Sequence, residues 1–182
     1  MNEQAPSPIQ SAVKPGLTIG LVTLVLSYLA YFIDSSYLAS GYFGLVVLVL
    51  FFALIIYFGK EYRNELGGFM SFGTAFNFSF FTILISGLIG LVGSILLFHV
   101  IDPSLPQVLG EITFESQLEM MEKFGASEAQ VEETVKRMQA EPKITSFKQV
   151  FLGLGLAIVF NFVKALILSI IIKKNEEVPD QI

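Results

Sequence analysis

Four long apolar stretches, separated by polar segments, dominate the pattern of the chain. They cover residues 15–34, 42–59, 72–101 and 149–172, and charged residues are almost absent from them. At about 1.5 Å per residue, an apolar helix of about 20 residues spans the hydrocarbon core of a bilayer. The pattern therefore predicts four transmembrane helices.

The chain begins with a polar, proline-containing segment over residues 1–14, for which we expect a disordered lead-in. Pro15 then suits the first turn of the first spanning helix. A cleaved signal peptide is the alternative interpretation. It is disfavoured because the amino-terminal region carries only Lys14 against Glu3 and lacks the expected cleavage pattern.

Residues 102–148 differ in composition from the rest of the chain, with nine acidic and five basic residues. Their apolar residues recur at helical spacing, as in Phe114, Leu118 and Met121, and Gly125 then provides a helix stop. Apolar residues recur at the same helical spacing after Gly125, in Val131, Val135 and Met138. The chain is therefore predicted to be all-α, with an amphipathic, acidic, extracytoplasmic helical hairpin between the third and fourth transmembrane helices.

The basic residues near the ends of the spans predict the orientation of the chain. In a protein with four crossings they all lie on one side, and the loop between the first two spans contains no Lys or Arg. The residues concerned are Lys14, Lys60, Arg63, Lys173 and Lys174. Loops rich in Lys and Arg stay in the cytoplasm, so both termini, including the tail over 173–182, are expected there. The basic residues of the hairpin favour the opposite orientation, but residues in long loops have little effect under this rule.

Composition supports a membrane protein and excludes several other classes. The mean hydropathy is +0.68 and only 15% of residues are charged. A net charge of −5 disfavours nucleic-acid binding. With no cysteine and a single histidine, His99, we expect no metal site and no cofactor. No combination of nucleophile, base and orienting group is evident, so we expect no catalytic residues and no enzymatic activity.

Lys164 is the most unusual residue because it lies inside the fourth apolar stretch. A charged lysine at mid-span costs about 2.5 kcal/mol or more, so it should face the bundle interior, a wet cavity or the interface. Asn161, one turn away, and Asn77, at similar depth in the third span, are its candidate polar companions. One interpretation is a lysine that only snorkels or bonds its neighbours. The other is a binding residue for an anionic lipid headgroup or substrate.

His99 and Asp102 form a candidate interface pair at the outer end of the third span. They are three residues apart and are expected to share one helix face. Such a pair provides a hydrogen bond at the helix end or, because histidine titrates near neutrality, a pH-sensitive contact.

Small residues recur at helix-packing spacing in two spans. They are Gly16 and Gly20 in the first span, and Ser86, Gly90 and Ser94 in the third. Four-residue spacing of small side chains allows two helices to approach closely. We expect these positions to pack helices within one chain, with a homo-oligomer contact as the alternative.

Several short motifs together resemble a known family. They are GGFMSFGTAF over 67–76, HVIDP over 99–103, MMEKFG over 120–125, SEAQ over 127–130 and IIKK over 171–174. This combination is similar to small bacterial four-helix membrane proteins catalogued as a domain of unknown function, the 4199 family. The resemblance covers nearly the whole chain. It implies a bacterial inner-membrane location and assigns no activity.

Two functional hypotheses remain open from the sequence. The first is a non-enzymatic protein of the lipid bilayer that assembles or regulates a membrane-protein partner, or forms a homo-oligomer. The alternative is a small transporter or lipid-binding protein that uses a polar cavity around Lys164. The second requires Lys164, Asn161 and Asn77 to converge on a cavity, whereas the first expects a closed bundle with an exposed apolar or small-residue face.

Overall fold

The computed structural model describes residues 6–140 and 147–175, and the elements within them are helical apart from one isolated β-bridge. Four segments are long and apolar enough to cross a membrane. They are α1 (Pro8–Ile33), α2 (Gly41–Glu65), α3 (Phe72–Leu96) with its π-helical extension η2 (Leu97–Ile101), and α6 (Phe147–Ile172). A 3-10 turn η1 (Ser35–Ala39) joins α1 to α2, and α4 (Leu105–Lys123) and α5 (Glu128–Ala140) lie between η2 and α6. The predicted all-α class, with four spans and a hairpin before the last, is confirmed.

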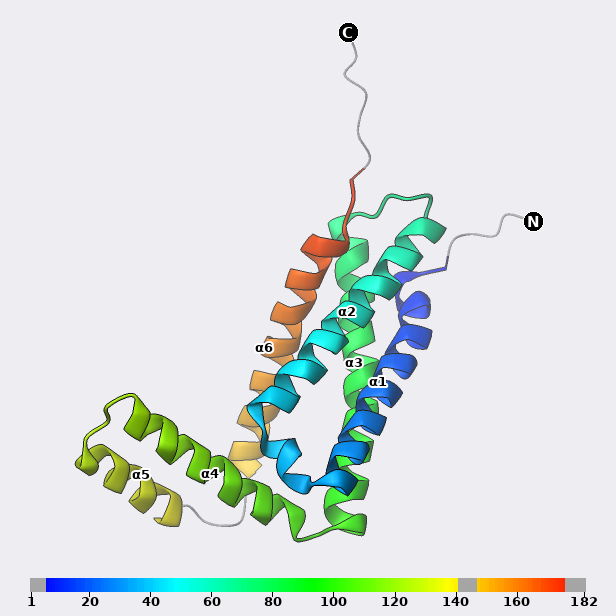
Figure 1. The fold of residues 1–182 in the computed structure, drawn as a ribbon. Helices are drawn as coiled ribbons and strands as arrows, with labels where there is room; N and C mark the ends of the chain where they lie inside the picture. Colours follow the sequence, from blue (N-terminus) through cyan, green and yellow to red (C-terminus); the bar gives the residue numbers. More distant parts are fainter. Residues whose placement is uncertain (1–5, 141–146, 176–182) are drawn as a thin grey trace.

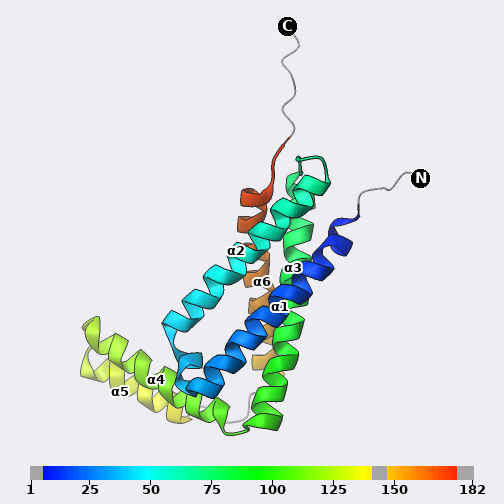
Figure 2. The same cartoon turned by 45° about the vertical axis from the view of Figure 1, so that its right-hand side comes forward.

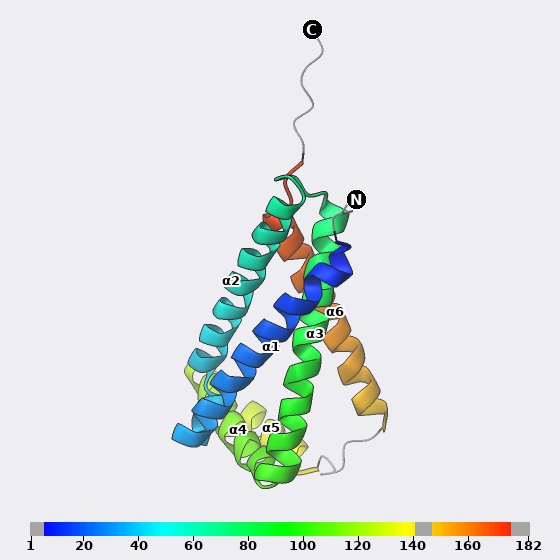
Figure 3. The ribbon, with the colours of Figure 1, turned by 90° about the vertical axis from the view of Figure 1, so that its right-hand side faces the viewer.

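The four spans form a bundle with the hairpin at one end and both termini at the other (Figure 1). The most extensive packing joins α1 to α3 and α3 to α6. Figure 3 shows that α6 approaches α3 near its carboxyl end and diverges from it toward its amino end. The buried residues of the described part of α6 agree, because they run from Ala165 to Ile172. The contact between α6 and α3 is therefore tight at the terminal end and looser toward the hairpin end.

Two helices extend beyond their predicted bounds. Helix α1 begins at Pro8, because Ser7 and Gln10 form a capping box that satisfies two backbone donors. This corrects the lead-in predicted over 1–14 for residues 8–14, whereas residues 1–5 lie outside the described residues. Helix α2 likewise continues from the predicted end at 59 to Glu65.

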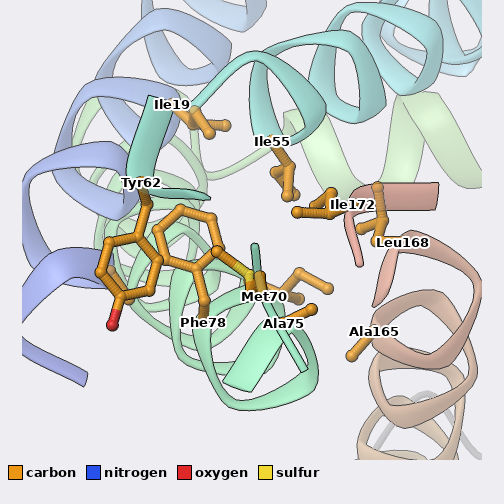
Figure 4. Close-up of a cluster of buried hydrophobic side chains, with 11 residues drawn as sticks. Ile19, Ile55, Tyr62, Met70, Ala75, Phe78, Ala165, Leu168 and Ile172 are labelled. Atoms are coloured by element: carbon orange, nitrogen blue, oxygen red, sulfur yellow. The ribbon is translucent and has the colours of Figure 1, made fainter. Parts of the chain in front are cut away.

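The main core lies in the terminal half of the bundle (Figure 4). Phe78 of α3 is fully buried and stacks on Tyr62 of α2, with ring centroids 5.3 Å apart. Around this pair lie buried apolar side chains from all four spans, including Ala12, Ile19, Ile55, Ala75, Ala165, Leu168 and Ile172. Shape-matched packing of this kind stabilises membrane bundles, in which lipid removes most of the hydrophobic driving force.

Backbone contacts close the same end of the bundle. Met70 and Lys174 exchange two backbone hydrogen bonds of 2.8 and 3.0 Å, although they lie far apart in the sequence. The Nη1 atom of Arg63 donates to the carbonyl oxygen of Ile172 at 3.0 Å, where α6 leaves its last carbonyls unpaired. We call this set of contacts, made by Arg63, Met70, Ile172 and Lys174, the terminal clasp. The chain can reach it because Gly67 and Gly68, both with positive φ, turn sharply after α2.

Candidate functional site

A cavity of about 340 Å³ lies between the spans at the centre of the bundle and extends toward its hairpin end. All four spans contribute to its wall. The lining residues are Thr23 of α1, Gly44, Val47, Leu48 and Phe51 of α2, Ile83, Ser86, Gly87 and Gly90 of α3, and Asn161 and Lys164 of α6. We call it the Lys164 cavity. Apart from the amide and the ammonium group, its chemistry is dominated by apolar side chains and glycines.

Glycines explain why this space is empty. A Cβ atom built on Gly44, Gly87 or Gly90 would meet no atom within 4 Å. Larger side chains at these positions would fill the cavity, and α6, which diverges from α3 (Figure 3), supplies Asn161 and Lys164 to its wall. The cavity therefore depends on the glycines of α2 and α3 and on the direction of α6.

The positive charge of Lys164 has an amide as its hydrogen-bond partner. Its Nζ atom lies 3.4 Å from Oδ1 of Asn161, one turn earlier on α6. The ion pairs found among the described residues, Lys123 with Glu119 and Lys136 with Glu132, both lie in the hairpin. Within the described residues, no carboxylate therefore neutralises Lys164. A charge in this position is expensive to keep in a bilayer and favours an anionic partner.

The hydroxyl groups in the wall restrict where an anion can bind. Thr23 donates its proton to the carbonyl oxygen of Ile19 at 2.9 Å, and Ser86 donates to the carbonyl oxygen of Thr82 at 2.7 Å. A hydroxyl group has one proton, so toward the cavity both present only acceptor lone pairs. The Lys164 ammonium and the amide nitrogen of Asn161 remain as the donors. An anion would therefore bind at the α6 side of the cavity.

The structure brings together two of the three residues predicted to form the polar site, Lys164 and Asn161. Asn77 is exposed on α3 and is not part of the cavity lining. It precedes Ile83, which does line the cavity, by about 1.7 helical turns, so the two side chains leave α3 in different directions. Phe76, next to Asn77, contacts Phe162 of α6 with ring centroids 5.1 Å apart. The prediction that Asn77 shares a site with Lys164 is therefore wrong.

The predicted small residues separate into two groups. A Cβ atom on Gly16 would lie 2.7 Å from Cβ of Ile85, and one on Gly20 would lie 2.7 Å from Cδ1 of Ile89. The Ser86 hydroxyl, which donates its one proton to the carbonyl oxygen of Thr82, also lies 3.1 Å from the carbonyl oxygen of Gly16. Gly16, Gly20 and Ser86 thus pack α1 against α3 within one chain.

The other two small residues face open space. Gly90 lines the Lys164 cavity, and Ser94 is exposed beside a second hollow of about 280 Å³ that shares Thr23 and Gly90 with it. Thr23 and Gly44 are cavity residues that the sequence analysis missed. A hydroxyl or a glycine inside an apolar span is the signal that could have identified them.

The predicted pair of His99 and Asp102 does not form a hydrogen bond. The Asp102 carboxylate instead accepts from the Ser104 hydroxyl at 2.6 Å and from the Tyr31 hydroxyl at 3.3 Å. It also accepts from the backbone N–H of Leu105, and the hydrogen bond from Ser104 is the main reason that the pKa of Asp102 is lowered. The π-helical turn η2, in which the Asp102 N–H bonds the Leu97 carbonyl oxygen, changes the i, i+3 geometry expected of an α-helix. His99 is left exposed.

Fold and site together define a class, a multi-pass membrane protein with one cationic side chain facing an open cavity between its spans. Among the described residues, no three His, Asp or Glu side chains lie close enough to hold a metal ion. The family described as "Protein of unknown function (DUF4199)" matches residues 14–174, and the chain belongs to this family. No curated protein and no solved structure matches the chain.

Proposed function

We propose that this protein is a non-enzymatic membrane protein that binds the anionic headgroup of a membrane amphiphile in the Lys164 cavity. The observation that carries the proposal is the position of Lys164. Its ammonium group faces a cavity between apolar helices and, among the described residues, has an amide and no carboxylate beside it. An incoming anion would offset the cost of this charge.

The shape of the cavity favours an amphiphile over a free ion. Leu48 in its wall is 43% exposed, and Gly44 and Gly87 are also exposed, so the cavity opens sideways toward lipid. A volume of about 340 Å³ is at the lower end of the ~300–1,000 Å³ typical of ligand sites. Such a volume holds a headgroup, while the acyl chains remain in the bilayer outside the opening.

The proposal includes a location and an orientation. The basic residues near the start of α1 and the ends of α2 and α6 belong to the end of the bundle where the chain starts and finishes (Figure 1), and they are Lys14, Lys60, Arg63, Lys173 and Lys174. The positive-inside rule favours this end as the cytoplasmic one, in the bacterial inner membrane that the family resemblance implied. The Lys164 cavity would then extend from the middle of the membrane toward the extracytoplasmic leaflet.

A role in the assembly or regulation of a membrane partner is the second candidate. It is favoured by the middle of α6, where Leu156, Ile158, Val159 and Phe160 are exposed, Phe160 by 63%. A second copy of the chain or another membrane protein would cover this face. In the lipid-binding proposal, the same face contacts acyl chains.

Native mass spectrometry of the protein released gently from its own membrane tests the proposal. The wild-type chain is expected to retain an acidic lipid, and Lys164→Leu is expected to lose it. Lys60→Leu, which removes an exposed cation at the terminal end, serves as the matched control and should retain the lipid. Equal retention by all three chains would refute the proposal, and a stoichiometric protein partner without lipid would favour the second candidate.

A further inference from the structure

The turn of the α4–α5 hairpin exposes a concentrated apolar surface far from the Lys164 cavity. Phe124 is 88% exposed and Met120 is 55% exposed. Together with Met121 and Ala126 they border a hollow of about 570 Å³ at the turn. We call Met120, Met121 and Phe124 the apolar tip. An exposed aromatic ring beside two methionines is unusual on a surface that faces only water.

Local hydrogen bonds hold the apolar tip in one conformation. At the end of α4, the Ala126 N–H bonds the Met121 carbonyl oxygen at 2.9 Å, and Gly125 adopts a positive φ of 80°. This is the Schellman arrangement, which ends a helix with a glycine. Ser127 and Gln130 then form a capping box that starts α5. The hydrogen bonds that end α4 and start α5 therefore hold the backbone at Phe124 in the conformation that exposes its ring.

The hairpin runs sideways from the bundle, so the tip lies beside the spans. Figures 1 and 2 show α4 leaving the end of α3 and extending outward, with the tip level with the adjoining ends of α2 and α6. The 19 residues of α4 extend it by about 28 Å. The adjoining end of α2 is the start of a candidate membrane span, Gly41–Glu65, and Tyr42 is 85% exposed there. A membrane that surrounds the spans therefore meets the tip at its interface.

The charges near the tip permit this position. Glu119 is paired with Lys123 at 3.3 Å, and Glu132 is paired with Lys136 at 2.6 Å. Each ion pair is neutral as a whole, so these four side chains add no net charge beside the tip, where Glu122 and Glu128 are the further acidic residues. Lys123, adjacent to Phe124, has a stem long enough to keep its ammonium group in water while the ring enters the interface.

We propose that the apolar tip inserts into the boundary between headgroups and acyl chains, and thereby holds the α4–α5 hairpin against the membrane surface. The partner is the lipid surface itself. Insertion of Phe124 and Met120 to a depth of a few ångströms removes their apolar area from water, as in helices that lie in the membrane interface. This proposal does not depend on the Lys164 cavity.

The absence of cysteine from the chain makes a direct test available. Single variants Phe124→Cys and Met120→Cys, labelled with an environment-sensitive fluorophore, are reconstituted in phosphatidylcholine vesicles. Met120→Cys keeps the Phe124 ring in place. Lys136→Cys, on the exposed polar surface of α5, is the matched control. We expect blue-shifted emission and quenching by lipids with a shallow nitroxide at both tip positions, and water-like emission at position 136.

Two results would overturn the proposal. One is water-like, unquenched emission at both tip positions in chains that circular dichroism shows to be folded. The other is a blue shift that grows with the protein-to-lipid ratio and is insensitive to nitroxide lipids, which would assign the tip to a contact between two copies of the chain.

Discussion

The two ends of the bundle are built from the same kind of apolar helix but pack differently. At the terminal end, Phe78 stacks on Tyr62 and the terminal clasp joins α2, α3 and α6. At the hairpin end, α6 diverges and glycines line the Lys164 cavity. The two ends of the same apolar spans therefore have different functions in the molecule, because bulky side chains lie at one end and small side chains at the other. The terminal end, which we call the closed end, stabilises the fold through its packed core. The hairpin end, which we call the open end, contains the Lys164 cavity.

The largest expected effect breaks the closed end. Phe78→Ala removes a fully buried ring and should lower the free energy of unfolding by about 3 kcal/mol, because the surrounding helices cannot collapse completely into the space. Phe160→Ala, on the exposed part of α6, is the matched control and should change it by less than about 0.5 kcal/mol. Unfolding titrations in mixed detergent micelles measure both. Equal losses of unfolding free energy in the two variants would contradict the claim that the closed end is more tightly packed than the exposed part of α6.

A pair of glycine substitutions sharpens the comparison. Gly20→Leu should destabilise the chain by about 2 kcal/mol, because its Cβ would lie 2.9 Å from Cβ of Ile89 and 3.1 Å from the backbone Cα of Ser86. Gly87→Leu should leave stability unchanged, because its Cβ would meet no atom within 4 Å, and its side chain should reduce lipid retention by entering the cavity. The same unfolding titrations, together with native mass spectrometry, distinguish the two. A stability loss for Gly87→Leu equal to that for Gly20→Leu would show that the open end is packed.

The charge of the open end gives the next prediction. Asn161→Asp places a carboxylate beside the Lys164 ammonium group, so the cavity loses its excess positive charge. Retention of an acidic lipid should fall about tenfold, equivalent to about 1.4 kcal/mol. Asn77→Asp introduces the same charge on the exposed surface of α3 and should leave retention unchanged. Competition between phosphatidylglycerol and phosphatidylcholine in nanodiscs measures both variants, and identical behaviour would argue against the Lys164 cavity as the anion site.

The smallest expected effect concerns the attachment of the hairpin. The Ser104 hydroxyl and neighbouring donors lower the pKa of Asp102 below its ordinary value of 3.8. The carboxylate therefore stabilises the folded state above that ordinary value, and this contribution is lost as the pH falls through the lowered pKa. Hydrogen exchange in the first turn of α4 should accelerate below about pH 4. Asp102→Asn should abolish this pH dependence, and an unchanged acid response in the variant would assign it to other groups.

The sequence was sufficient to predict the spans because long uncharged stretches of about 20 residues have few alternatives to a membrane helix. The hairpin was predictable from local signals, because its apolar residues recur at helical spacing and Gly125, with its positive φ, ends α4. Lys164 stood out because charge is rare in such stretches. These features depend on nearest neighbours along the chain.

The remaining features depend on how helices meet. Whether Asn77 faces the cavity depends on the rotation of α3 against α6, which sequence spacing within one helix does not determine. The β-bridge between Met70 and Lys174 joins segments that are distant in the sequence, and the residues around each of them do not predict this pairing. The π-helical turn η2 similarly changes which residues near His99 share a face. In each case, packing between helices decides the outcome.

Photocrosslinking in vesicles tests most directly the claim that the open end binds an acidic amphiphile. A phosphatidylglycerol analogue with a diazirine near its headgroup is reconstituted with the wild-type chain and with Lys164→Leu, and adducts are mapped by mass spectrometry. The account predicts adducts concentrated on Val47, Leu48 and Phe51 of the cavity wall, and their loss in Lys164→Leu. Adducts spread evenly over the lipid-facing surfaces of the spans, and unchanged in Lys164→Leu, would contradict it.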